Sequence, residues 1–457
     1  MPPPTRTATP IRYEAVLTGH NPPVSSPSNH RTGPGPRGPG PRGVRAGILA
    51  ACAALLVASC GSGVHADAQL VGPGTTPPGP TTTAAGGRSA QTSGNAAGSL
   101  PTLVPAPPVP VTPHPICVNL TKLAGWSDQR LAMLTIAVPA QETAPSSVTA
   151  EVTAGAGGVL LFGSTAPAAL GADLTALKTH VPGGLGLLVM TDEEGGGIQR
   201  MANLVGSLPW PASMGANWSA AQIQAAVSAV ARKMSAAQVN MDLAPVIDVD
   251  GRNVLPGATD PDGMRSFSGS TAVVTRDGIA YMNGLRAGGV IPVLKHFPGL
   301  GGSSYNSDDG PAHTLPWATL SKVGVPPFTA AINAGAPAVM VSNDTVPGLA
   351  TNPSGLSPTV IGVLRGTLGF HGLVLTDSLT AGAVSGAGFT VPQAAVQALR
   401  SGADMVMFGL VSNVPAETSA ISSAIVAAVA NGSLPRNRLI DAATHILAVR
   451  HVNLCAS

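Results

Sequence analysis

Eight short apolar runs, separated by stretches patterned as helices, constrain this chain of 457 residues more than any other feature. Their hydrophobicity is nearly continuous rather than alternating, which is typical of parallel strands covered on both faces. Eight such strands alternating with helices predict an α/β fold: a (β/α)8 barrel of the TIM type, in a single domain. The runs are residues 131–138, 159–162, 187–190, 239–246, 290–296, 338–343, 373–376 and 404–408.

Helix signals lie between the runs. Ser357 is a candidate N-cap with Pro358 at the first helical position, and Pro392 opens an Ala-rich stretch that Gly402 ends. These signals support the alternation of strands and helices.

The first third of the chain has a different composition. Residues 1–115 are too rich in Pro, Gly, Ser and Thr to form a core, so the folded domain is predicted at residues 116–457. The apolar run 46–57 follows Arg42 and Arg45 and is too short to anchor the chain across a bilayer. It has the layout of a signal peptide.

We therefore predict a signal peptide over residues 1–59. The stretch before its apolar run is longer than an ordinary n-region. We interpret this as a start codon assigned too far upstream, with Val44 as the candidate start.

The end of this signal resembles a bacterial lipobox. Residues 57–60 read Val-Ala-Ser-Cys, which predicts that Cys60 is acylated and begins the mature protein; an ordinary secretion signal is the alternative. Residues 60–115 would then be the lipidated Cys and a disordered Pro/Thr/Gly tether. We expect a protein of the cell membrane, lipid-anchored on the extracytoplasmic face, that meets the membrane through this anchor alone.

Two cysteines remain once Cys52 has left with the signal and Cys60 carries lipid. Cys117 and Cys455 stand at the two ends of the folded domain. An even pair in an exported protein predicts a disulfide between them, with two free thiols as the alternative.

Charge and motifs exclude several classes of partner. The formal net charge is +2, and six Arg against one Glu lie in residues 1–45, so the rest is slightly acidic. An acidic, aromatic-poor body offers no footprint for nucleic acid. No GxGxxG opens a helix, and the ten His show no HxxxH spacing, so we expect no cofactor and no metal. We expect a monomer.

Polar groups follow several predicted strands. In a parallel barrel these positions gather at one face, where such barrels carry their active sites. Any single Asp or Asn there could instead cap the next helix, but capping does not explain Lys295 and His296 side by side at the end of a buried strand. The groups are Asp192-Glu193-Glu194, Asp248, Lys295-His296, Asn343-Asp344 and Asp377.

Five segments, in order, resemble the β-N-acetylhexosaminidases of glycoside hydrolase family 3. Residues 192–200 are similar to the family's DQEGGRVQR loop, and residues 240–249 to its NxxFAPVxDV segment. Residues 265–267 match its RSF, residues 295–301 its KHFPGHG loop, and residues 373–379 the segment that carries its nucleophile. The resemblance implies a single-domain barrel enzyme that cleaves glycosidic bonds.

The resemblance also assigns roles. Asp377 takes the position of the nucleophile. Substrate-binding roles fall on charged groups, which can grip sugar hydroxyls through paired hydrogen bonds. These are Asp192, Arg200, Arg265, Lys295 and His296.

The chain departs from the family where the proton is handled. Four residues after KHFPGHG the family has Asp-Ser-His, an acid/base dyad, and this chain has Asn306 and Asp308 in place of the Asp and the His. Other departures are Gly197, Leu300, Gly302 and Asn343. The chain therefore resembles a variant subfamily that lacks the usual dyad.

Three interpretations follow. Asp308, or the adjacent Asp309, is the acid/base, with a pKa raised by burial or by the charge of Asp377; His313 supplies an imidazole instead; or the protein binds sugar and cleaves nothing.

We expect the first interpretation: a membrane-tethered, exo-acting, retaining β-glycosidase that acts on cell-envelope glycans or their fragments. The alternative is a non-catalytic lipoprotein that binds sugars or muropeptides. Transfer to phosphate instead of water is a further outcome that the sequence leaves open.

Overall fold

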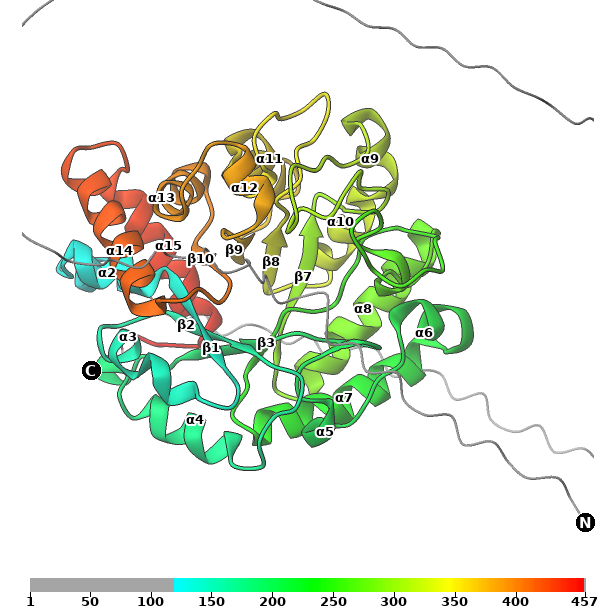
Figure 1. Cartoon of the computed structure of the whole chain (residues 1–457), viewed down its shortest axis with the longest axis horizontal. Helices are drawn as coiled ribbons and strands as arrows, with labels where there is room; N and C mark the ends of the chain where they lie inside the picture. Colours follow the sequence, from blue (N-terminus) through cyan, green and yellow to red (C-terminus); the bar gives the residue numbers. More distant parts are fainter. Residues whose placement is uncertain (1–118, 456–457) are drawn as a thin grey trace, which may run out of the picture. The chain divides into compact units, whose positions relative to one another are not determined.

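The computed structural model describes residues 119–455, and its main strands close into one parallel barrel (Figure 1). The order around the barrel is β1-β10-β9-β8-β7-β6-β3-β2, which confirms the predicted (β/α)8 architecture. The strands are β1 (Ile136–Gln141), β2 (Gly158–Phe162), β3 (Leu188–Thr191), β6 (Met241–Asp242), β7 (Ile291–Phe297), β8 (Ala338–Val341), β9 (Leu373–Ser378) and β10 (Met405–Met407).

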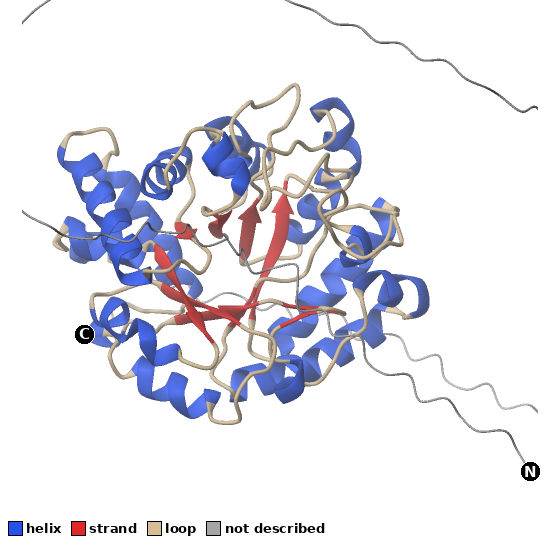
Figure 2. Ribbon diagram, in the orientation of Figure 1, coloured by secondary structure: helices blue, strands red, loops and turns tan. Residues whose placement is uncertain are grey.

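Helices surround the strands and connect each one to the next (Figure 2). The early helices are α1 (Leu120–Ala124), α2 (Asp128–Leu134), α3 (Thr149–Thr153), α4 (Leu170–Lys178), α5 (Ala202–Val205), α6 (Pro211–Asn217), α7 (Ala220–Ala236) and α8 (Thr271–Ala287). The later ones are α9 (Trp317–Val323), α10 (Val325–Asn333), α11 (Pro358–Gly362), α12 (Gly382–Gly386), α13 (Val391–Ser401), α14 (Val414–Ala430) and α15 (Arg436–Val449). Within the described range, no helix combines the length and apolar character needed to cross a membrane.

Several N-terminal predictions lie outside the described residues: the signal peptide, the lipidated Cys60, the tether and Cys117. Cys455 lies inside the described range and is disulfide-bonded. Its pairing with Cys117 stays a prediction.

The helix signals read from the sequence are confirmed. The Ser357 side chain accepts a hydrogen bond from the backbone N–H of Val360, and Pro358 opens α11. Pro392 lies in the first turn of α13, and Gly402 ends that helix with φ of 112°, a left-handed conformation that favours glycine.

The apolar run 131–138 was predicted to be a strand throughout. This prediction is wrong for the first half of the run. Leu131 to Leu134 lie in α2, which begins after Ser127 accepts a hydrogen bond from the backbone N–H of Arg130. The run is apolar because α2 packs against α14 and α15. The strand begins only at Ile136. A short apolar run does not distinguish a buried helix from a strand, whereas the Ser127 cap would have.

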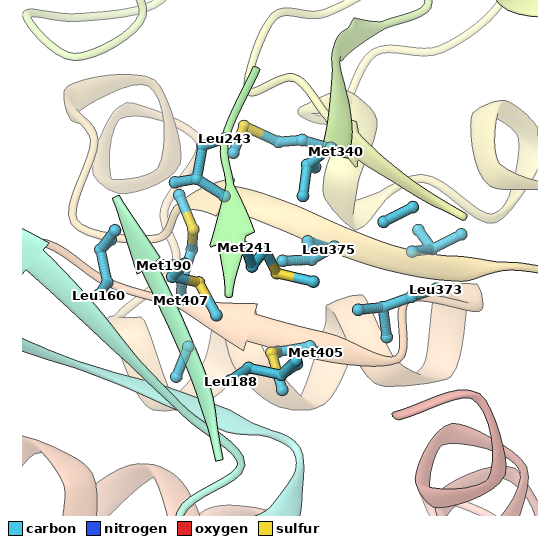
Figure 3. Packing of buried hydrophobic residues seen from close by; sticks show 14 of the residues in the cluster. Leu160, Leu188, Met190, Met241, Leu243, Met340, Leu373, Leu375, Met405 and Met407 are labelled. Carbon is cyan, nitrogen blue, oxygen red and sulfur yellow. The ribbon is translucent and has the colours of Figure 1, made fainter. Parts of the chain in front are cut away.

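Methionine and leucine side chains fill the inside of the barrel (Figure 3). They come from strands on all sides of the barrel, and each is almost completely buried. The flexible thioether of methionine suits this interior, because it fills irregular space. The methionines labelled in the figure are Met190, Met241, Met340, Met405 and Met407.

A small antiparallel hairpin follows β3 and positions the first site loop. It pairs β4 (Glu193–Gly195) with β5 (Ile198–Gln199). The turn needs glycine at Gly196, because φ is 60° there and an added Cβ would lie 2.0 Å from the ring of Trp210. The hairpin and Trp210 together hold the loop against the barrel.

Candidate active site

The polar groups predicted from strand ends meet at the carboxyl-terminal face of the barrel. Asp192 directly follows β3, Lys295 and His296 lie near the end of β7, and Asp377 lies near the end of β9. The strands are parallel, so these positions point to one end of the barrel. The Lys295–His296 peptide bond is cis.

Lys295 lies at the centre of a buried ion-pair network. Its Nζ is 2.8 Å from Asp192 and 2.6 Å from Glu194, and its side chain is only 3% exposed. Burial alone would lower the pKa of Lys295, but the two carboxylates outweigh it and the pKa is raised. The network therefore fixes a positive charge at the floor of the site.

Arg265 forms the second cationic anchor. Its Nε and Nη2 donate to the two carboxylate oxygens of Glu194 at 2.8 and 2.9 Å, a bidentate geometry. Burial alone would raise the pKa of Glu194, yet the charges of Arg265 and Lys295 lower it. Glu194 was not among the predicted sugar-binding residues, although it lies two positions after Asp192.

His296 is oriented by Asp248. The ring Nδ1 lies 2.7 Å from Asp248 Oδ2, and Arg265 Nη2 lies 3.2 Å from the ring Nε2. A guanidinium can only donate hydrogen bonds, so Nε2 of the ring is the acceptor. Nδ1 is therefore assigned the proton, and it donates a hydrogen bond to Asp248. Asp248 also accepts from the backbone N–H groups of His296 and Leu300. This explains why Leu300 can replace a histidine here: its backbone, not its side chain, makes the contact.

Arg200 completes the group of predicted binding residues. Its Nη2 lies 3.5 Å from Asp192, and its guanidinium lies over the ring of Phe162 at 5.8 Å. Burial alone would raise the pKa of Asp192, but Lys295 and Arg200 lower it. Through these interactions the structure links all five predicted binding residues, directly or through Glu194.

Asp377 is half-buried on β9 and carries the expected nucleophilic carboxylate. Its Oδ1 accepts a hydrogen bond from the backbone N–H of Ser378 at 2.6 Å. Nearby, Asn343 donates through its side chain to the carbonyl of Ser378 at 2.8 Å. Asn343, one of the departures from the family, thus supports the backbone next to Asp377.

Asp308 lies within the electric field of Asp377. Its pKa is raised to about 6, first because its carboxyl loses hydration and then because Asp377 is negatively charged. The positive charge of Arg265 acts in the opposite direction. The residue as a whole is exposed, yet enough protein surrounds the carboxyl to remove part of its hydration.

The loop that carries Asp308 is docked on the start of α12. The carbonyls of Ser307 and Asp308 accept from the backbone N–H groups of Ala383 and Gly382, both at 2.9 Å. A Cβ at Gly382 would lie 2.7 Å from the backbone of Asp309, so this close approach requires glycine. Because α12 follows β9, the contact ties the Asp308 loop to the strand that carries Asp377.

The two alternative acid/base candidates are less well placed. Asp309 is exposed, and it appears in the site only as a nearby charge that raises the pKa of Asp308. His313 is also exposed, and its ring Nδ1 lies 3.1 Å from the carbonyl of Thr314. Among the described residues, no hydrogen bond or ion pair joins the His313 ring to Asp377.

A layer of buried carboxyl groups lies beneath the site. Burial raises the pKa of Glu193 to about 7 and that of Asp344 to about 7, the latter despite a hydrogen bond from Ser303. Burial also raises the pKa values of Asp242 and Asp262 well above the usual range, and both oxygens of Asp262 lack a partner. Asp262 was not predicted as a site residue, because its position three residues before Arg265 is the only indication in the sequence.

Two clusters among the described residues have metal-ligand chemistry. In the first, Asp248, Asp262 and His296 bring their ligand atoms within 4.8 Å of one another, but Arg265 already contacts His296. The second comprises Asp404, Asp441 and His445, and Asp404 is paired with Arg365 and Arg438. In both clusters a guanidinium group already contacts a candidate ligand, so its positive charge would repel a metal ion there.

Comparison with known proteins is consistent with this geometry. The family model described as "Glycosyl hydrolase family 3 N terminal domain" matches residues 129–449. The chain is 31% identical over 423 residues to a protein of Mycobacterium tuberculosis named Beta-hexosaminidase LpqI, covering 89% of this chain and 97% of that protein.

Solved structures give the same result. A family 3 glycosyl hydrolase from Mycobacterium smegmatis is similar with a TM-score of 0.64 and 33% identity, over 72% of this chain and 98% of that one. A β-N-acetylhexosaminidase from Beutenbergia cavernae is similar with a TM-score of 0.64 and 28% identity, over 73% and 99%.

Proposed function

Because the chain belongs to glycosyl hydrolase family 3, we propose that it is an exo-acting, retaining β-glycosidase in which Asp377 is the nucleophile and Asp308 the acid/base. The observation that carries the proposal is the docking of the Asp308 loop on α12, the helix that follows the strand carrying Asp377. In this setting burial first, and then the charge of Asp377, raises the pKa of Asp308 to about 6. Most retaining glycosidases use a pair of carboxyl groups whose pKa values differ.

The proposed reaction has two steps. Asp377 attacks the anomeric carbon while Asp308 gives its proton to the glycosidic oxygen, so that the bond to the leaving group breaks and a glycosyl ester forms on Asp377. Water then attacks the anomeric carbon, Asp308 takes its proton, and Asp377 is released. Lys295, Arg265 and His296 would hold the sugar during both steps.

The charge of Asp377 also suits Asp308 to its change of role. While Asp377 is ionised, it raises the pKa of Asp308 and favours the protonated acid. Ester formation removes that charge, so the pKa of Asp308 falls and the carboxylate base is favoured when water attacks. The loss of the family's histidine is thereby compensated by a second carboxyl.

N-acetylhexosamine is the proposed sugar, because the relatives above are named for that activity and the sugar-gripping residues match. Cell-envelope glycans or their fragments are the proposed polymer, since the lipobox-like residues 57–60 would tether the protein outside the membrane. The non-catalytic sugar binder is the competing function.

The deciding experiment measures hydrolysis of a panel of aryl β-glycosides, with the N-acetylglucosaminide first. The proposal expects turnover that Asp377→Ala abolishes. A non-catalytic sugar binder would show no turnover on any of these substrates. Calorimetry would then detect sugar binding that survives Asp377→Asn but is lost in Arg200→Ala. Products measured with and without phosphate would distinguish hydrolysis from transfer to phosphate.

A further inference from the structure

A cavity of about 680 Å³ lies at the opposite end of the barrel from the active site. It is lined by the first residues of three strands, Leu188, Ile291 and Leu373, and by residues just before them. Because the strands are parallel, their beginnings gather at the amino-terminal face. In barrels of this type that face usually serves stability rather than binding.

The lining of this cavity is one-sided in charge. Arg286 and Arg450 line it together with three histidines, His371, His445 and His451. No Asp or Glu is among the described residues that line it. A carboxylate does contact one lining residue: Asp404 lies 3.1 Å from His445, but Arg365 and Arg438 already pair with it.

Among residues 119–455, Arg450 has no ionic partner. Its guanidinium donates to the carbonyls of Gly157 and Gly186, and its buried Nε has no hydrogen-bond partner. Burial lowers its pKa to about 9, so the group still carries its charge at neutral pH. A partly buried cation with spare hydrogen-bonding capacity is stabilised by an anion.

Two further basic side chains of the lining are open to a ligand. Arg286 and His371 are exposed, and within the described part of the chain the Arg286 side chain makes one hydrogen bond, to the carbonyl of Ala334 at 3.2 Å. An anion that would neutralise them is not supplied by the described lining residues, which include no acidic side chain.

We infer that this cavity, which we name the basal cavity, binds a phosphate-bearing anion. Two guanidinium groups suit a ligand with two or more negative charges, and phosphate matches their planar, forked donors. The volume is within the range of small-molecule sites and exceeds the needs of a single ion. The ligand is therefore a phosphorylated small molecule or the headgroup of an anionic phospholipid.

Isothermal titration of the whole protein with inorganic pyrophosphate tests the inference, with two kinds of variant. The triple variant Arg286→Ala/His371→Ala/His451→Gly removes exposed basic side chains without touching the core, and glycine relieves the positive φ of 57° at His451. Arg450→Gln removes the unpartnered cation, and thermal unfolding monitors the loss of its bonds to Gly157 and Gly186. Lys322→Ala, an exposed charge on α9 outside the cavity, is the matched control.

We expect the triple variant to bind pyrophosphate at least tenfold more weakly and the control to bind within twofold of the unchanged protein. Sedimentation with phosphatidylglycerol vesicles, against phosphatidylcholine vesicles, distinguishes the sources. Loss of vesicle binding in the triple variant assigns a lipid headgroup, and loss of pyrophosphate binding alone assigns a free phosphate. Absence of binding in both assays, or equal binding by the triple variant and the unchanged protein, overturns the inference.

Discussion

Asp248 holds the ring of His296 through a 2.7 Å contact to Nδ1 while accepting two backbone N–H groups, so one carboxylate orients both the strand end and its imidazole. The opposite ring nitrogen faces Arg265. The sugar-binding residues are thus positioned through shared partners, and a change in one should be felt by its neighbours.

Asp248→Asn should therefore weaken substrate binding. Asparagine has one carbonyl oxygen and one NH₂ group where Asp248 has two accepting oxygens. Its NH₂ group would therefore face a group that now donates to Asp248, either the Leu300 backbone N–H or the His296 ring. We expect a stability loss of about 1 to 3 kcal/mol. KM for the aryl glycoside should rise more than kcat falls. Urea unfolding and steady-state kinetics measure the two effects, and a variant with unchanged KM would contradict the positioning role.

Asp308→Asn should remove general acid catalysis. With a poor leaving group we expect kcat/KM to fall by about 100- to 10,000-fold. With a dinitrophenyl leaving group, which needs no proton, the first step should be nearly unaffected, so a glycosyl-enzyme should accumulate. Asp309→Asn is the matched control and should stay within a few-fold of wild type. If Asp309→Asn carries the large loss instead, the roles of the two residues are reversed.

The pH dependence of the unchanged enzyme follows from the same residue. The acid form of Asp308 is required, and its pKa is raised to about 6, so kcat/KM should fall as pH rises through about 6. A pH profile of kcat/KM with a poor leaving group measures this limb. Substrates with an activated leaving group should lack it, and a limb of equal size in Asp308→Asn would show that another group is responsible.

Glu194→Gln should destabilise the fold. It leaves Lys295 and Arg265 with less compensation in a buried site, which typically costs about 3 to 5 kcal/mol. The folded pKa of Glu194 is lowered, so its contribution is complete above the unfolded pKa and is lost as pH falls. The difference in unfolding free energy between wild type and variant should therefore shrink below about pH 4. A difference that grows on acidification would refute the ion-pair explanation.

Gly382→Ala should impair activity more than stability. The added methyl would meet the backbone of Asp309 at 2.7 Å and push the Asp308 loop away from α12. We expect kcat/KM to fall at least tenfold, with the alkaline limb of the pH profile moving because the surroundings of Asp308 change. Gly362→Ala, in a helix with nothing within 4 Å, is the control and should be neutral or slightly stabilising. Equal effects of both variants would argue against loop docking.

The barrel could be predicted because each strand corresponds to its own apolar run, and Lys295, His296 and Asp377 could be placed at one face because the strand ends of a parallel barrel converge. The sugar-binding roles, including those of Arg200 and Arg265, came only from the resemblance to the family. Val246, for example, extends the fourth predicted run beyond β6 and still pairs with Lys295 as an isolated bridge. What failed depends on packing between distant segments. Residues 131–134 are apolar in a helix or a strand alike, and only their contacts with α14 and α15 decide.

The same limit applies to the site. Asp262 lies in a long loop with no strand before it, so nothing in its neighbourhood shows that it is fully buried beside Asp248. Asp308 could be chosen as a candidate from its position in the loop. Its raised pKa, however, depends on Asp377, which is far away in the sequence and near only in the folded barrel.

Because methionines fill the interior of the barrel, their oxidation should report how often the barrel opens. Met190, Met241, Met340 and Met405 are at most 1% exposed, so an oxidant in the solvent reaches them only when the barrel opens. A sulfoxide formed then is polar and fits poorly when the strands close again. Mass spectrometry after brief peroxide exposure would thus count opening events, and each event would leave the chain chemically marked against refolding.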